Sequence, residues 1–122
     1  MTMQARVLIA DDCPRSRSGL RAVLALRPEI EIAGEASDGQ EAVRLVEEHR
    51  PDVVLIDARM PVLDGVEATR LIKERWPEVR VVVLTIDASY RADALAAGAD
   101  AFLIKGCAAR ELLAAIAGQS EG

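Results

Sequence analysis

The stretch Val53-Val54-Leu55-Ile56-Asp57-Ala58-Arg59-Met60-Pro61 decides the fold, because four consecutive apolar residues in it end at an aspartate. A strand that is buried on both faces has such an unbroken apolar run, since helices cover both sides of a parallel sheet. The residues that follow are typical of a loop, with the turn pair Asp64-Gly65, and apolar residues at helical spacing resume at Val66. The stretch therefore predicts a buried strand over residues 53–56, followed by a loop and a helix.

The same alternation of apolar runs and amphipathic stretches continues on both sides of this segment. Further strands are predicted over 7–10, 30–36, 81–84 and 101–104. Further helices are predicted from Pro14, after Ser37-Asp38-Gly39, over 91–97 and over 109–117, with Pro51, Trp76-Pro77 and Gly98 as stops. Five strand–helix units in succession predict an α/β fold with a doubly wound parallel sheet, and the alternation at the start of 30–36 indicates an edge strand.

Composition and charge restrict the class of protein further. The 122 residues are 51% hydrophobic, which suits one domain with its own core and argues against disorder. A net charge of −5 argues against direct binding of nucleic acid or of an anionic membrane. No apolar run approaches the ~20 residues of a membrane span, residues 1–6 hold no signal-peptide stretch, and two cysteines cannot form a disulfide framework. We expect a cytoplasmic domain over residues 1–118, with 119–122 as a polar tail or the start of a truncated linker.

Polar side chains directly follow four of the predicted strands. They are Asp11, Asp12, Asp57, Thr85 and Lys105. The carboxyl ends of parallel strands line one rim of a sheet, where ligands bind, so we expect these side chains to meet in one pocket. Three carboxylates repel one another unless a cation is present, and Mg²⁺ suits such an oxygen-rich site. A lysine and a threonine could then bind phosphoryl oxygens, while a central aspartate acts as the nucleophile.

Four motifs together resemble the receiver domain of two-component response regulators over nearly the whole chain. They are residues 7–12, 54–61 with Asp64-Gly65, 83–85 and 98–105. The run Asp57-Ala58-Arg59-Met60-Pro61 is most similar to the subgroup whose members carry a C-terminal helix-turn-helix. The resemblance implies a flavodoxin-like, five-stranded parallel sheet in the order 2-1-3-4-5. It also implies a sensor histidine kinase as phosphoryl donor and a surface switch that controls transcription through a DNA-binding domain absent from this chain, with a homodimer on phosphorylation left open.

The resemblance also assigns roles to individual residues. Asp57 would be the phosphoacceptor, and Thr85 and Lys105 would bind the phosphoryl group. The Mg²⁺ ligands would be Asp11, Asp12, Asp57 and the backbone carbonyl of Arg59. Phe102 would be the aromatic residue that changes rotamer when Thr85 moves. The domain would catalyse only its own phosphorylation and dephosphorylation.

Two departures from the family pattern affect these expectations. Ile86 stands where a small residue is usual, at the mouth of the pocket, and its branched side chain should slow both phosphorylation by small donors and attack by water. Gly98 follows Thr85 by 13 residues, about two fewer than in the family pattern. This shorter segment predicts a short loop or a short fourth helix.

The residues leave one main alternative and one remote alternative, and they exclude a third. A pseudo-receiver would keep the fold and bind proteins without phosphorylation. A phosphohydrolase of the haloacid-dehalogenase type would need a second aspartate where Arg59 stands, and a flavodoxin would need a Ser/Thr/Gly-rich loop where Asp11-Asp12 stands. Separately, Cys13 and Cys107 each lie close to a site residue in the sequence, so a redox link between them could disable the site.

Overall fold

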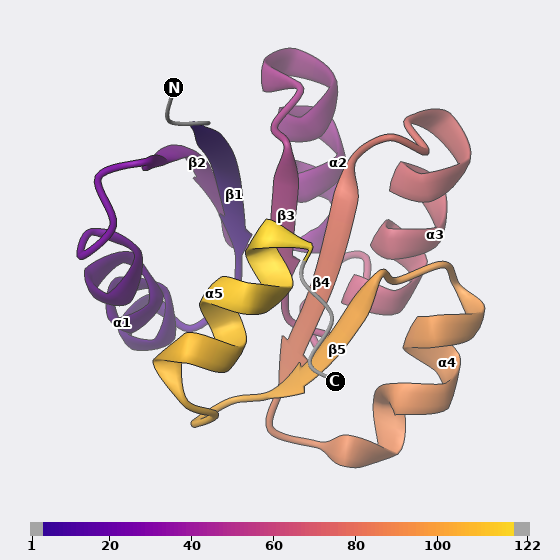
Figure 1. The fold of residues 1–122 in the computed structure, drawn as a ribbon. Helices are drawn as coiled ribbons and strands as arrows, with labels where there is room; N and C mark the ends of the chain where they lie inside the picture. The colour runs from indigo at the N-terminus through magenta and orange to yellow at the C-terminus, as the bar shows by residue number, and fades with distance from the viewer. Residues whose placement is uncertain (1–3, 119–122) are drawn as a thin grey trace.

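Five parallel strands form a single sheet in this computed structural model, which describes residues 4–118 (Figure 1). The strands are β1 (Ala5–Ala10), β2 (Ile30–Ala36), β3 (Val53–Ile56), β4 (Arg80–Thr85) and β5 (Ala101–Ile104). Their order across the sheet is β2-β1-β3-β4-β5, and each neighbouring pair is parallel. Both the predicted fold class and the predicted strand order are therefore confirmed. The predicted tail over 119–122 lies outside the described residues.

Helices cover both faces of the sheet (Figure 1). They are α1 (Pro14–Leu24), α2 (Gly39–His49), α3 (Gly65–Arg75), α4 (Arg91–Ala96) and α5 (Ala109–Ala117), with a 3₁₀ turn, η1 (Ala88–Tyr90), before α4. On one face Ile9 and Leu55 pack in the cluster that contains residues of α1 and α5. On the other face Leu8 and Ile56 pack in the cluster that contains residues of α2, α3 and α4. Successive residues of the central strands thus face opposite helical layers, as a doubly wound sheet requires.

The central strand β3 is buried on both faces, as its sequence predicts. All four of its residues are at most 3% exposed, with Val54 and Ile56 directed to one layer and Val53 and Leu55 to the other. The outer strands β2 and β5 are partly exposed, in keeping with their places at the two edges of the sheet.

Two strands begin earlier than their apolar runs predict. β1 begins at Ala5 and β4 begins at Arg80, and both strands include an arginine near their start. Arg6 Nη1 donates to the carbonyl oxygen of His49 at 2.7 Å, and Arg80 Nε donates to that of Ala115 at 2.6 Å. Each arginine therefore satisfies carbonyls near the end of a neighbouring helix, which allows a charged residue to stand in a strand.

The segment between β4 and β5 is short, as the count of residues predicts. It holds the three-residue turn η1 and a six-residue α4, which ends one residue before the predicted 97. Gly98, the predicted stop, has φ +105°, which only glycine adopts readily. Within residues 4–118, no helix is long and apolar enough to cross a membrane.

Candidate functional site

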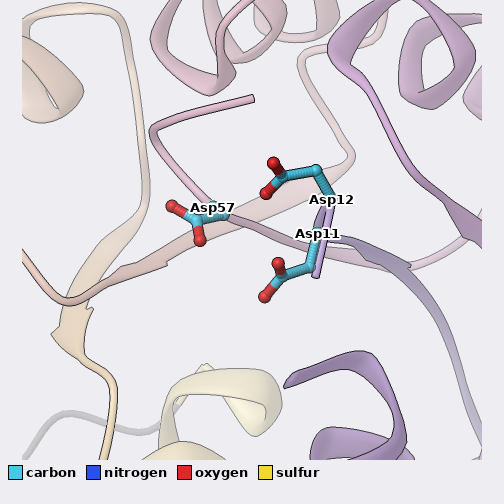
Figure 2. Close-up of side chains that lie close together, drawn as sticks. All are labelled: Asp11, Asp12 and Asp57. Atoms are coloured by element: carbon cyan, nitrogen blue, oxygen red, sulfur yellow. The ribbon is translucent and has the colours of Figure 1, made fainter. Parts of the chain in front are cut away.

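The three predicted aspartates meet at the carboxyl end of the sheet (Figure 2). Asp11 and Asp12 follow β1, and Asp57 follows the neighbouring strand β3. One carboxylate oxygen from each of the three residues lies within 4.8 Å of the others. Asp11 and Asp57 are buried, at 1% and 9% exposure, whereas Asp12 is exposed. Figure 2 shows all three carboxylates directed to the same side of the strand ends.

Lys105 supplies the positive charge that this cluster needs. Its Nζ lies 2.7 Å from Asp11 Oδ2 and 2.6 Å from Asp57 Oδ2. Burial alone would lower the pKa of Lys105, but the hydrogen bonds and charges of these two aspartates outweigh it and raise the pKa above the usual 10.5. One ammonium group is therefore shared by two buried carboxylates. Lys105 follows β5 and Asp11 follows β1, so the sheet brings together residues that are far apart in the sequence.

Asp11 is held by donors on every side. Its Oδ1 accepts from the backbone N–H of Cys13 at 2.9 Å, and its Oδ2 accepts from Ser16 Oγ at 2.6 Å as well as from Lys105. Burial would raise the pKa of Asp11, but the hydrogen bonds from Lys105, Ser16 and Cys13 together lower it below the usual 3.8. Asp11 is accordingly ionised in the folded protein at neutral pH.

The loop after β3 fixes the position of Asp57. Arg59 N donates to Asp57 Oδ1 at 3.0 Å, and Gly65 N donates to the carbonyl of Ala58 at 2.8 Å. Val62 has φ +71°, a left-handed conformation that is strained for a β-branched residue, and Leu63 N donates across it to Pro61 O at 2.8 Å. The loop between Asp57 and α3 is thus tightly constrained.

Thr85 and Lys105 also meet at this rim, at the ends of neighbouring strands. Lys105 N donates to the Thr85 carbonyl at 2.9 Å. The Thr85 side chain is completely buried, while Ile86, the next residue, is 75% exposed. Phe102 is partly buried against the α2/α3/α4 layer, with the Arg91 guanidinium 6.0 Å from its ring centroid. The rotamer change assigned to Phe102 and the access-limiting role of Ile86 remain predictions.

An open pocket of about 440 Å³ adjoins the carboxylates. It is lined by Asp12, Arg59, Met60, Pro61, Asp64 and Tyr90. Sequence reasoning missed Tyr90 as a lining residue because it belongs to the short turn η1, whose path depends on the length of the whole β4–α4 segment. It also missed Ser16, for which the only available signal was a polar residue in the first turns of the helix after Asp11-Asp12.

The two cysteines are free thiols, one exposed (Cys13) and one half-buried (Cys107). Burial raises the pKa of the Cys107 thiol, and the negative charge of Glu111 raises it further. Because the thiolate is the reactive form, these surroundings disfavour reaction of Cys107 at neutral pH. The surroundings of Cys107 therefore give no support to a redox link between Cys13 and Cys107.

The ion pairs of Lys105 predict how the stability of the domain depends on pH. We expect Lys105→Met to lower the free energy of unfolding by about 1–3 kcal/mol at pH 7 without Mg²⁺, because two buried carboxylates lose their partner. The lowered pKa of Asp11 stabilises the wild type above pH 3.8, and this contribution is lost as pH falls below that value. The raised pKa of Lys105 keeps its own contribution present up to pH 10.5 and beyond, until the folded-state pKa is passed.

The difference between wild type and Lys105→Met should therefore be largest across the neutral range and should shrink on acidification. Urea unfolding in the presence of a chelator, repeated from pH 7 down to pH 3, measures it. A difference that stays constant down to the lowest pH would show that the methionine acts through packing and not through the lost ion pairs.

The sequence of this chain matches one protein-family model and is similar to several known proteins. The family model described as "Response regulator receiver domain" matches residues 7–117. The transcriptional regulatory protein DegU of Brevibacillus brevis is 41% identical over 119 residues, which cover 96% of this chain and 50% of that protein. The transcriptional regulatory protein LiaR of Bacillus subtilis is 44% identical over 119 residues, covering 96% of this chain and 56% of that protein.

Solved structures of response regulators have the same fold as this chain. The receiver domain of the response regulator NarL from Mycobacterium tuberculosis superposes with a TM-score of 0.87 at 31% identity, covering 96% of this chain and 99% of that one. A LuxR-family response regulator from Aurantimonas also gives 0.87, at 34% identity, covering 95% of this chain and 87% of that one.

The chain belongs to the response regulator receiver domain family. The resemblance stated from four motifs is confirmed, and so is the predicted subgroup, since the relatives are transcriptional regulators and a LuxR-family regulator is among the structures. Membership in this family excludes the phosphohydrolase and flavodoxin alternatives. The chain spans about half the length of the curated relatives it matches, so the activity of a whole regulator is a separate question.

Proposed function

We propose that this receiver domain accepts a phosphoryl group on Asp57 in a Mg²⁺-dependent reaction, with the phosphohistidine of a sensor histidine kinase as the donor. In this step an Asp57 carboxylate oxygen forms a bond to phosphorus while the P–N bond of the donor breaks and the imidazole leaves. The observation that carries the proposal is Lys105, which bridges the carboxylates of Asp11 and Asp57 within a cluster of three acids.

The chemistry of the acid cluster fits Mg²⁺. Carboxylates with one oxygen each within 4.8 Å provide the hard ligands that this ion prefers, and its usual sites use one or two carboxylates together with waters and a phosphate oxygen. Asp11 already accepts three protein hydrogen bonds. Asp12 and Asp57 are therefore the better direct ligands, with the Arg59 carbonyl, and Asp11 contributes its charge and the lone pair of Oδ1 that its hydrogen bonds leave available. When bound, the ion neutralises charge on the phosphoryl oxygens.

Lys105 and Thr85 have distinct tasks in this proposal. The Lys105 ammonium exchanges its contact with Asp57 for a phosphoryl oxygen, because phosphorylation consumes the negative charge of that carboxylate. The Thr85 hydroxyl donates to a second phosphoryl oxygen. To reach that oxygen, the Thr85 side chain would move toward the phosphoryl group. Because Thr85 is completely buried at the end of β4, this movement would disturb the packing around Phe102 on the neighbouring strand β5. The resulting surface change would control transcription through the remainder of a longer regulator, with dimerisation as one route.

The intact mass of the chain after incubation with acetyl phosphate and MgCl₂ tests the proposal. We expect one phosphoryl adduct that fails to form when EDTA replaces MgCl₂ and that disappears in hydroxylamine, which cleaves acyl phosphates. An adduct that resists hydroxylamine would place the phosphoryl group on a residue other than an aspartate. A chain that takes up no phosphoryl group, even with Ile86→Ala, would favour the pseudo-receiver alternative.

Ile86 should limit access to the phosphorylated aspartate. The side chain is 75% exposed beside Thr85, so the domain gains little packing energy from it. We expect Ile86→Ala to fold as the wild type does and to lose its phosphoryl group several-fold faster, because attacking water would meet less obstruction. The decay of the adduct after removal of donor, followed by intact mass, measures this rate. Leu26→Ala is the matched control, since Leu26 is equally exposed at 75% and lies outside the rim; equal decay rates in all three proteins would refute the role of Ile86.

A further inference from the structure

Among the donors to the Asp11 carboxylate, the hydroxyl of Ser16 is the uncharged side-chain group. The Oγ of Ser16 donates to Asp11 Oδ2 at 2.6 Å, and Lys105 Nζ donates to the same oxygen at 2.7 Å. The backbone N–H of Cys13 occupies Oδ1 at 2.9 Å. A carboxylate offers about four lone pairs, so roughly one, on Oδ1, stays available for a further partner.

The first turns of α1 hold Asp11 by both its main chain and its side chain. Arg17, next to Ser16, donates from Nη1 to the Asp11 carbonyl oxygen at 2.6 Å and from Nε to Glu35 at 3.3 Å. Ser16 is half-buried, and Pro14 stands at the start of the helix, where its ring favours helical backbone. Arg17 therefore holds the main chain of Asp11, while Ser16 holds its carboxylate.

Lys105 is a less constant partner for Asp11, because it also lies 2.6 Å from Asp57. In the proposed reaction Lys105 moves toward the phosphoryl group, and Ser16 then remains the side-chain donor to Asp11 Oδ2. We propose that Ser16 is a positioning residue of the Mg²⁺ site: it fixes the Asp11 carboxylate so that the free lone pair of Oδ1 serves the ion or a water of its shell. This inference rests on the proposed function.

Partners that orient the ligands of a metal typically contribute 10–100-fold in metal affinity. We expect Ser16→Ala to weaken Mg²⁺ binding about tenfold or more, measured by isothermal titration calorimetry with MgCl₂ on the unphosphorylated domain. Ser16→Thr should restore wild-type affinity, because it keeps the hydroxyl and its methyl group has room. The space beside Ser16 is a cavity of about 270 Å³, lined among others by Gly19, Leu20 and Lys105.

Ser18→Ala is the matched control, because Ser18 lies on the same helix and is exposed. It should bind Mg²⁺ as the wild type does, and urea unfolding without Mg²⁺ should show that all variants are folded. The inference is wrong, and the proposed function stands, if the wild type binds Mg²⁺ and Ser16→Ala binds it equally or more tightly. Tighter binding would mean that the hydroxyl competes with the ion. If the wild type binds no Mg²⁺, the proposed function fails and the inference fails with it.

Discussion

Asp57→Asn should take up no phosphoryl group from acetyl phosphate under conditions that label the wild type completely. An amide oxygen is a poor nucleophile at phosphorus, so the loss should be total and not a change of rate. The substitution keeps the size of the side chain and the oxygen that accepts from Arg59 N at 3.0 Å. It replaces the oxygen 2.6 Å from Lys105 Nζ with a neutral group, which leaves Lys105 paired with Asp11 at 2.7 Å.

The same variant should still fold, because Lys105 keeps its contact with Asp11 and the substitution removes one of three clustered negative charges. Intact mass measures the adduct, and urea unfolding measures the stability. A single adduct on Asp57→Asn, formed at the wild-type rate, would mean that another residue is the acceptor. A variant that is unfolded would be replaced by Asp57→Glu, which keeps the charge but moves the carboxylate away from its place at the end of β3.

Gly65→Ala should be among the most destabilising small substitutions in the domain. A Cβ at this position would lie 1.9 Å from the carbonyl oxygen of Asp57 and 2.9 Å from the Cα of Ala58, and both of these are backbone atoms. The clash can be relieved only by moving the loop that positions Asp57 or the start of α3. We expect a loss of about 3 kcal/mol or more in the free energy of unfolding, together with slower phosphorylation.

Gly19→Ala provides the matched control for this effect. Gly19 lies inside α1, and a Cβ there would have no atom within 4 Å. Because alanine favours helix, this variant should be more stable by about 0.5–1 kcal/mol. Urea unfolding of the two variants side by side separates the effect of the close approach at Gly65 from the general effect of replacing glycine. Equal stabilities would show that the backbone at residues 57–65 can relax without cost.

Three strands have the bounds that the sequence predicts, the central strand β3 and the two edge strands β2 and β5. β3 has the predicted bounds because all four of its residues are apolar and covered on both sides, and the last helix also has the predicted bounds. The starts of β1 and β4 were predicted too late, because Arg6 and Arg80 interrupt the apolar pattern. Their hydrogen bonds to helix carbonyls connect residues far apart in the chain, and no local pattern reports such contacts.

The acid cluster could be predicted for a similar reason of topology. Residues that directly follow parallel strands must meet at one rim, so Asp11, Asp57 and Lys105 could be placed together before any distance was known. The residues that contact these side chains could not be predicted, because their positions depend on the path of the loops and on which face of α1 turns inward. Ser16 and Tyr90 belong to this second class, and the left-handed backbone of Val62 is a further example, since nothing in a valine suggests it.

The position of the phosphoryl group on the chain is the most direct test of the account. Borohydride reduces an aspartyl phosphate to homoserine, with release of phosphate, so a phosphorylated and reduced sample carries a permanent mark at the acceptor. Peptide mass mapping of that sample locates the mark. The account predicts homoserine at position 57 alone, formed only in samples that contained Mg²⁺. Homoserine at position 11 or 12 with aspartate intact at 57 would contradict it.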